Sequence, residues 1–149
     1  MTANFTKAKE LIESSNKILF TTHERTDGDD LGSVLALAEA TRNLGKQVSI
    51  VTTGGVPSRL QYLPMADDVN EDLLSEDFDL LVVSCCSSLS RINNAKIENL
   101  QVPIINFDHH PDNKNYADVN VVDSTKSSVA ELVFDFFRFC EWEINHQVA

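Results

Sequence analysis

Short apolar runs recur along this chain, and segments with helical spacing lie between them. The runs have the length and branched side chains of buried strands, and they span residues 17–22, 47–52, 79–84 and 102–107. Amphipathic helices are predicted at residues 3–15 and after Asp30, which is a candidate N-cap. A further helix follows Ser127 or Ser128, either of which can cap it. Strands that alternate with helices favour an α/β fold, an open parallel sheet flanked by helices.

Composition narrows the classes of function. The 149 residues suit one domain, and no apolar run approaches the ~20 residues that span a bilayer, so no membrane partner is expected. Three cysteines form an odd number without framework spacing, which predicts a reduced, cytoplasmic setting. The net charge of −11 argues against duplex DNA as a partner, because that requires a basic surface. Carboxylates in a cleft repel phosphate unless divalent cations intervene, so an acidic chain that acts on phosphate is expected to bind metal.

Polar side chains stand directly after three of the apolar runs. His23 follows the first run, Cys85 follows the third and Asp108 follows the fourth. In open parallel sheets, ligands bind at the carboxyl ends of strands, near the point where the strand order reverses. We therefore expect these positions to converge in one cleft.

The segment Asp108-His109-His110 is the stronger of two candidate metal motifs. Adjacent side chains at a strand end diverge, so one imidazole can bind a metal while the other faces a substrate. Asp108 would orient the histidines from behind. The alternative is a polar loop after a buried strand.

The second motif is His23-x3-Asp27-x-Asp29, with Gly28 allowing a tight backbone between the carboxylates. Histidine together with aspartate suits Mn²⁺ or another borderline ion better than Ca²⁺, which takes oxygen ligands only. The alternative is a cluster of aspartates that only caps the following helix.

These motifs resemble those of a known family. Residues 22–33 and 108–110 resemble the first and third motifs of the DHH phosphoesterase superfamily, which includes RecJ-like exonucleases and bifunctional oligoribonuclease and PAP phosphatases. Residues 127–133 resemble the helix start that follows the third motif. The resemblance covers roughly residues 15–149 and implies the fold of a DHH-type N-terminal domain.

The resemblance also implies an activity and a set of roles. The expected function is divalent-metal-dependent hydrolysis of short phosphorylated substrates, such as small single-stranded oligonucleotides or nucleoside bisphosphates, by a two-metal mechanism. Two Mn²⁺ ions are expected, with Mg²⁺ or Zn²⁺ as alternatives. The implied metal ligands are His23 and Asp27 for one ion, and Asp29 and His109 for the other. The implied catalytic residues are His110 and Asp108, and the implied substrate-binding residues are His110, Arg91 and Ser128.

The sequence departs from the family pattern at Cys85, where the second motif normally has an aspartate that bridges the metals. A cysteine thiolate can bind metal there and would shift the preference towards zinc. Alternatively, a buried Cys85 without metal is an inert apolar residue. A redox role for Cys85 and Cys86 is disfavoured, because adjacent cysteines lack the Cys-x-x-Cys spacing.

A second departure concerns the end of the chain. Residues 142–149 resemble the segment just before the family's fourth motif, so residues 1–149 are expected to form a single domain that stops before that motif and lacks the C-terminal substrate-binding domain. The rival function is therefore a degenerate, non-catalytic DHH-like domain that binds nucleotide or metal, or acts as a partner module. The sequence leaves a homodimer open.

Overall fold

The apolar runs form the centre of one sheet in the computed structural model, which describes all of residues 1–149. The sheet has six strands in the order β3-β2-β1-β4-β5-β6, and every neighbouring pair is parallel. The strands are β1 (Lys17–Thr22), β2 (Gln47–Val51), β3 (Val69–Asn70), β4 (Leu80–Ser84), β5 (Ile104–Asp108) and β6 (Val119–Val122). The predicted open parallel sheet is confirmed.

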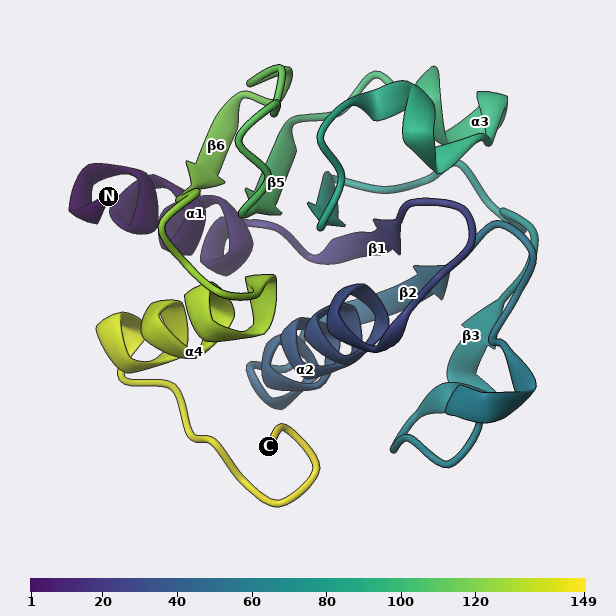
Figure 1. Cartoon of the computed structure of the whole chain (residues 1–149), viewed down its shortest axis with the longest axis horizontal. Coiled ribbons are helices and arrows are strands. Elements are labelled where there is room, and N and C mark those ends of the chain that lie inside the picture. Colours follow the sequence, from purple (N-terminus) through teal and green to yellow (C-terminus); the bar gives the residue numbers. More distant parts are fainter.

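Helices connect the strands. They are α1 (Thr2–Ser14), α2 (Gly28–Asn43), α3 (Ala95–Glu98) and α4 (Val129–Cys140), with short 3-10 turns at Ser58–Leu60, Ala66–Asp68 and Leu89–Ile92. Figure 1 shows α1, α2 and α4 gathered together and α3 lying apart from them. None of these helices has the length and apolar character needed to cross a membrane.

Alternation along the strands builds a core on each face of the sheet. Ile18 and Phe20 point into the larger core with α1, α2 and α4, whereas Leu19 points into the smaller core with α3. All residues of β4 are buried, which explains why its sequence is apolar on both faces. The large core therefore holds α2 and α4 against the same face of the sheet.

Two strands and one cap differ from the sequence-based expectations. β3 lies in an acidic stretch and β6 lies in a polar loop, and neither carries a sustained apolar run. The predicted cap Asp30 is wrong. Asp27 caps α2 by accepting from the backbone N–H groups of Asp29 and Asp30, while the Asp30 side chain accepts from the Asp27 N–H. The helix therefore begins three residues before Leu31, because the two aspartates form a reciprocal capping box.

Candidate metal centre

Strands β1, β4 and β5 end together at one edge of the sheet. The register pairs Thr22 with Ser84 and Ser84 with Phe107, so the residues that follow leave the sheet side by side. Because β2 lies on one side of β1 and β4 on the other, the strand order reverses here. This is the position at which parallel sheets bind ligands.

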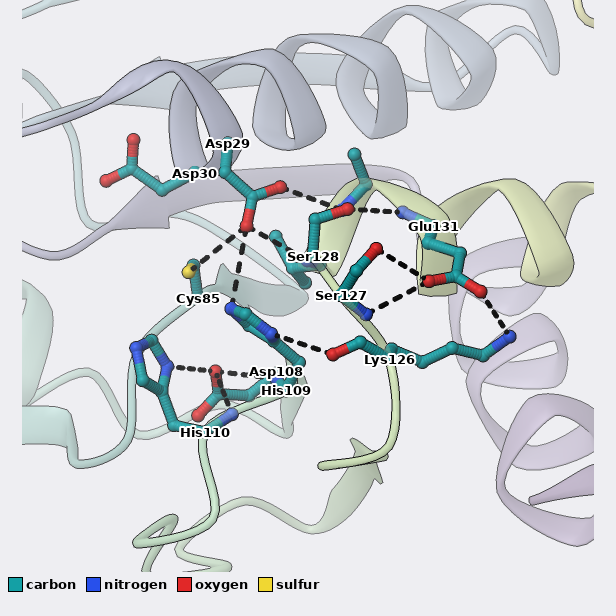
Figure 2. Close-up of polar contacts among 12 residues, drawn as sticks. Asp29, Asp30, Cys85, Asp108, His109, His110, Lys126, Ser127, Ser128 and Glu131 are labelled. Carbon is teal, nitrogen blue, oxygen red and sulfur yellow. Dashed lines mark hydrogen bonds and ion pairs between the residues drawn. The ribbon is translucent and has the colours of Figure 1, made fainter.

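Asp108 organises the two histidines that follow it. It is fully buried. Its Oδ1 atom accepts from the backbone N–H groups of His109 and His110, at 2.8 and 3.2 Å, and from His110 Nδ1 at 2.7 Å. The side-chain amide of Asn113 donates to its Oδ2 atom. Because Nδ1 of His110 donates to a carboxylate, its Nε2 atom is left to face the site (Figure 2).

His109 is oriented in the same manner. Its Nδ1 lies 3.3 Å from the carbonyl oxygen of Lys126, which can only accept. Nδ1 therefore donates, and in the neutral ring Nε2 carries the lone pair. The rings of His109 and His110 have centroids 4.9 Å apart and lie tilted to one another. The expected divergence of neighbouring side chains is therefore not observed. The strand ends at Asp108, which binds both following N–H groups and turns the chain.

Asp29 reaches this centre from the first turn of α2. Its Oδ2 and Oδ1 atoms accept from the backbone N–H groups of Val129 and Ala130, each at 3.0 Å, at the start of α4. Its Oδ2 atom lies 3.6 Å from His109 Nε2 and 3.9 Å from Cys85 Sγ. The positive end of α4 thus fixes a carboxylate next to a free imidazole nitrogen, as Figure 2 shows.

Cys85 occupies the turn directly after β4. It is buried and has a φ of 55°, a left-handed conformation that residues other than glycine rarely adopt. Candidate ligand atoms of Cys85, His109 and His110 all lie within 4.8 Å of one another. Burial, with the charges of Asp29 and Asp108 added, raises the pKa of the Cys85 thiol far above its ordinary value. In the absence of a cation the thiol therefore stays protonated at neutral pH.

His23 and Asp27 make other contacts. His23 is buried, its Nδ1 donates to the Glu24 carbonyl at 2.7 Å, and its Nε2 lies 3.1 Å from Asp30 Oδ2. Asp27 serves as the cap of α2, which was the alternative interpretation of this motif. Neither residue belongs to the cluster of Cys85, His109 and His110, and their binding of metal stays a prediction.

The predicted substrate-binding residues lie nearby. Arg91 is exposed on the turn after β4, and its carbonyl oxygen accepts from the Glu24 N–H at 2.9 Å, joining the loops after β1 and β4. Ser128 caps α4, with its hydroxyl oxygen accepting from the Glu131 N–H at 3.1 Å. Contact of either side chain with substrate stays a prediction.

Two polar residues that contact the predicted site residues, Asp30 and Asn113, were not predicted from the sequence to do so. Asp30 is fully buried between Thr22 and His23, and burial raises its pKa to about 6, while the charge of His23 opposes that rise. The signal was present, because Asp30 stands one helical turn after Asp27. Asn113 had no such signal, because it is one polar residue in a loop rich in asparagine and aspartate.

Fold and site together define a class. This is an open parallel α/β domain in which Cys85, two histidines and Asp29 converge where the strand order reverses. The arrangement is suited to holding a divalent cation against a small anionic ligand. Residues 17–149 match the family described as "DHH family, N-terminal domain". The chain belongs to the DHH family.

Curated relatives agree with this assignment. The chain is 29% identical over 140 residues to the probable bifunctional oligoribonuclease and PAP phosphatase NrnA of Streptococcus mutans, covering 93% of this chain and 44% of the relative. It is 26% identical over 145 residues to the corresponding protein of Bacillus subtilis, again covering 93% and 44%. The chain therefore spans less than half the length of these relatives.

Solved structures share the fold. An exopolyphosphatase-related protein from Bacteroides fragilis superposes with a TM-score of 0.84 at 23% identity, over 93% of this chain and 44% of that chain. The exonuclease RecJ bound to manganese superposes with a TM-score of 0.52 at 18% identity, over 92% of this chain and 37% of that chain. At these identities the likeness concerns the fold alone.

Proposed function

We propose that this chain is the metal-dependent hydrolytic domain of a phosphoesterase that cleaves short phosphorylated molecules, namely small oligonucleotides or nucleoside bisphosphates. The observation that carries the proposal is the convergence of Asp29, His109 and His110 at the ends of the central strands. Membership of the DHH family supports it, as do relatives described as oligoribonucleases and PAP phosphatases.

The donor atoms fit a divalent cation. In neutral His109, Nε2 carries the lone pair that can bind the ion, because Nδ1 donates to the Lys126 carbonyl oxygen. A carboxylate oxygen of Asp29 lies beside His109 Nε2, and Asp29 and His109 would hold an ion together. His23 and Asp27 would hold a second ion at the start of α2. Manganese, found in the RecJ structure, is the ion expected from the family, with magnesium and zinc as alternatives.

Different residues of this chain would have different roles in hydrolysis. A bound divalent cation supplies Lewis-acid chemistry, lowering the pKa of water and offsetting charge on phosphoryl oxygens. As the imidazolium, His110 would donate from Nε2 to a phosphoryl oxygen and pass that proton to the leaving group. Asp108 would keep that ring in place by holding the proton on Nδ1. Arg91 and Ser128 would contact the substrate from the turn after β4 and the start of α4.

One observation favours a second candidate, a non-catalytic domain that binds a nucleotide or a single metal ion. Cys85 stands where the family's bridging aspartate is expected, and its thiol is buried and protonated in the absence of metal. Loss of a bridging ligand lowers the affinity for a pair of metal ions more than it lowers the stability of the fold.

The test is hydrolysis of defined substrates. Purified chain is incubated with di- and trinucleotides, and with a nucleoside 3′,5′-bisphosphate, in separate series with Mn²⁺, Mg²⁺ and Zn²⁺. We expect metal-dependent release of mononucleotide or phosphate, which His109→Ala abolishes and His146→Ala leaves intact, because His146 is exposed and outside the centre. Bound metal without release of product in any series would favour the non-catalytic domain.

A further inference from the structure

The donor set around Cys85 differs from a set made only of imidazoles and carboxylates. The thiol of Cys85 points into the same space as His109 and His110, and candidate ligand atoms of all three lie within 4.8 Å of one another. Asp29 Oδ2 lies 3.9 Å from Sγ and 3.6 Å from His109 Nε2. A tetrahedral zinc ion has bonds of about 2.0–2.3 Å to such donors, so its ligand atoms lie within a few ångströms of one another.

The surroundings of these donors are those of a prepared metal site. Both imidazoles have Nδ1 held by an oxygen acceptor, the Asp108 carboxylate for His110 and the Lys126 carbonyl for His109. Such partners fix the ring orientation and leave Nε2 as the metal-binding atom. Cys85 is held in its turn by a bond from its own N–H to the Phe107 carbonyl at 2.8 Å, which joins it to the strand that precedes the histidines.

From this geometry we infer that the chain binds one zinc ion through Cys85, His109 and His110, with Asp29 beside the fourth position. Thiolate ligands select zinc over manganese, which is also the weaker binder in the general order of divalent affinities. His110 then serves as a ligand instead of the phosphate contact proposed above. The inference shares the centre of the proposed function but does not depend on hydrolysis.

The neighbouring cysteine supplies a matched control. Cys86 is also buried, but it packs into the opposite core and its Sγ donates to the Ser88 carbonyl at 3.0 Å. Cys86→Ser therefore removes a second buried thiol, one residue away, without changing any of the proposed ligands.

The first experiment needs no variant. Metal-free protein is titrated with Co²⁺ as a spectroscopic stand-in for zinc, and zinc is then added in competition. We expect one cobalt ion per chain with a thiolate-to-cobalt charge-transfer band in the near ultraviolet, which one equivalent of zinc removes and excess Mn²⁺ does not. Cobalt binding without that band would overturn the inference, and so would displacement by Mn²⁺ at equal concentration.

Variants then assign the thiolate. Cys85→Ser should abolish the band and weaken zinc binding by more than about 100-fold, beyond the 10–100-fold that loss of an outer partner costs. Cys86→Ser should retain both the charge-transfer band and the wild-type affinity for zinc. An unchanged band in Cys85→Ser, or its loss in Cys86→Ser, would contradict the assignment. Zinc binding without hydrolysis would contradict the proposed function but not this inference. Manganese-dependent hydrolysis without a cobalt–thiolate band would contradict this inference but not the proposed function.

Discussion

The Asp29 carboxylate accepts a hydrogen bond from the backbone N–H of Val129 at 3.0 Å, although the two residues lie 100 positions apart. Asp29 belongs to the first turn of α2 and Val129 to the first turn of α4. The same carboxylate faces His109. One side chain thus joins two helix starts to the candidate metal centre.

Asp29→Asn tests this junction. An asparagine offers one acceptor oxygen, so one of the two N–H groups of α4 must face the amide's own N–H donors. We expect the free energy of unfolding to fall by about 1–3 kcal/mol and metal affinity to fall with it. Chemical denaturation and metal titration measure the two effects. Asp112→Asn, in an exposed loop position, is the control, and equal behaviour of both variants would show that the junction contributes nothing.

Asn113→Ala tests the support of Asp108. The substitution removes the amide that donates to Asp108 Oδ2 and leaves the buried carboxylate with fewer donors. Because His110 depends on that carboxylate for its orientation, metal affinity should fall by about 10–100-fold, as for other outer partners of metal ligands. Isothermal titration with zinc and manganese measures it, with Asp112→Ala in the same loop as control. Wild-type affinity in Asn113→Ala would mean that the amide does not position the site.

Cys85→Asp tests whether the second motif limits activity. Aspartate tolerates the left-handed conformation at this position better than most residues, so the variant should fold. It would place a carboxylate beside His109 and His110, and manganese-dependent release of mononucleotide should rise by about tenfold or more, equal to roughly 1.4 kcal/mol of barrier. Cys85→Asn matches its shape without the charge and should show no gain. Equal rates of mononucleotide release from the aspartate and asparagine variants would show that a missing carboxylate at this position does not limit activity.

Asp79 is predicted to make the stability of the fold depend on pH in the acidic range. Its Oδ2 atom accepts from the backbone N–H groups of Lys17 and Asn16, and these bonds lower the pKa of its carboxyl below the ordinary value of 3.8. The folded state binds this proton less tightly than the unfolded state, so the stabilisation is complete above pH 3.8 and is lost as the pH falls below it. Asp79→Asn should therefore have a lower free energy of unfolding than wild type at pH 7, and this difference should shrink as the pH falls below 3.8. Urea unfolding along a pH series measures the gap, and a constant gap would contradict the assignment.

Much of this fold follows from local sequence. The run at residues 17–22 predicts β1 with its observed bounds, because a buried central strand must be apolar on both faces. Ser128 was one of two predicted caps of α4 and is the observed one. β3 has only two residues and takes its place from its pairing with β2, so no local pattern marks it.

The site was less predictable, for a physical reason. The apolar runs placed His23, Cys85 and Asp108 at the ends of strands. Because parallel strands end at the same edge of the sheet, these residues were expected to lie near one another. The partners of each side chain depend on contacts that only the folded chain creates. The Asp30 side chain lies beside His23 in the interior, and the Asp29 carboxylate accepts from the N–H of Val129, which lies 100 positions further along the chain.

The most direct test of a metal centre at the strand ends is an anomalous difference map from crystals of this chain grown with zinc, and separately with manganese. A zinc ion held here should give a peak about 2.0–2.1 Å from His109 Nε2 and about 2.3 Å from Cys85 Sγ, and a manganese ion should give a peak within bonding distance of His109 Nε2. Maps with both metals that show no peak between these two side chains, at metal concentrations that saturate other sites, would contradict the account.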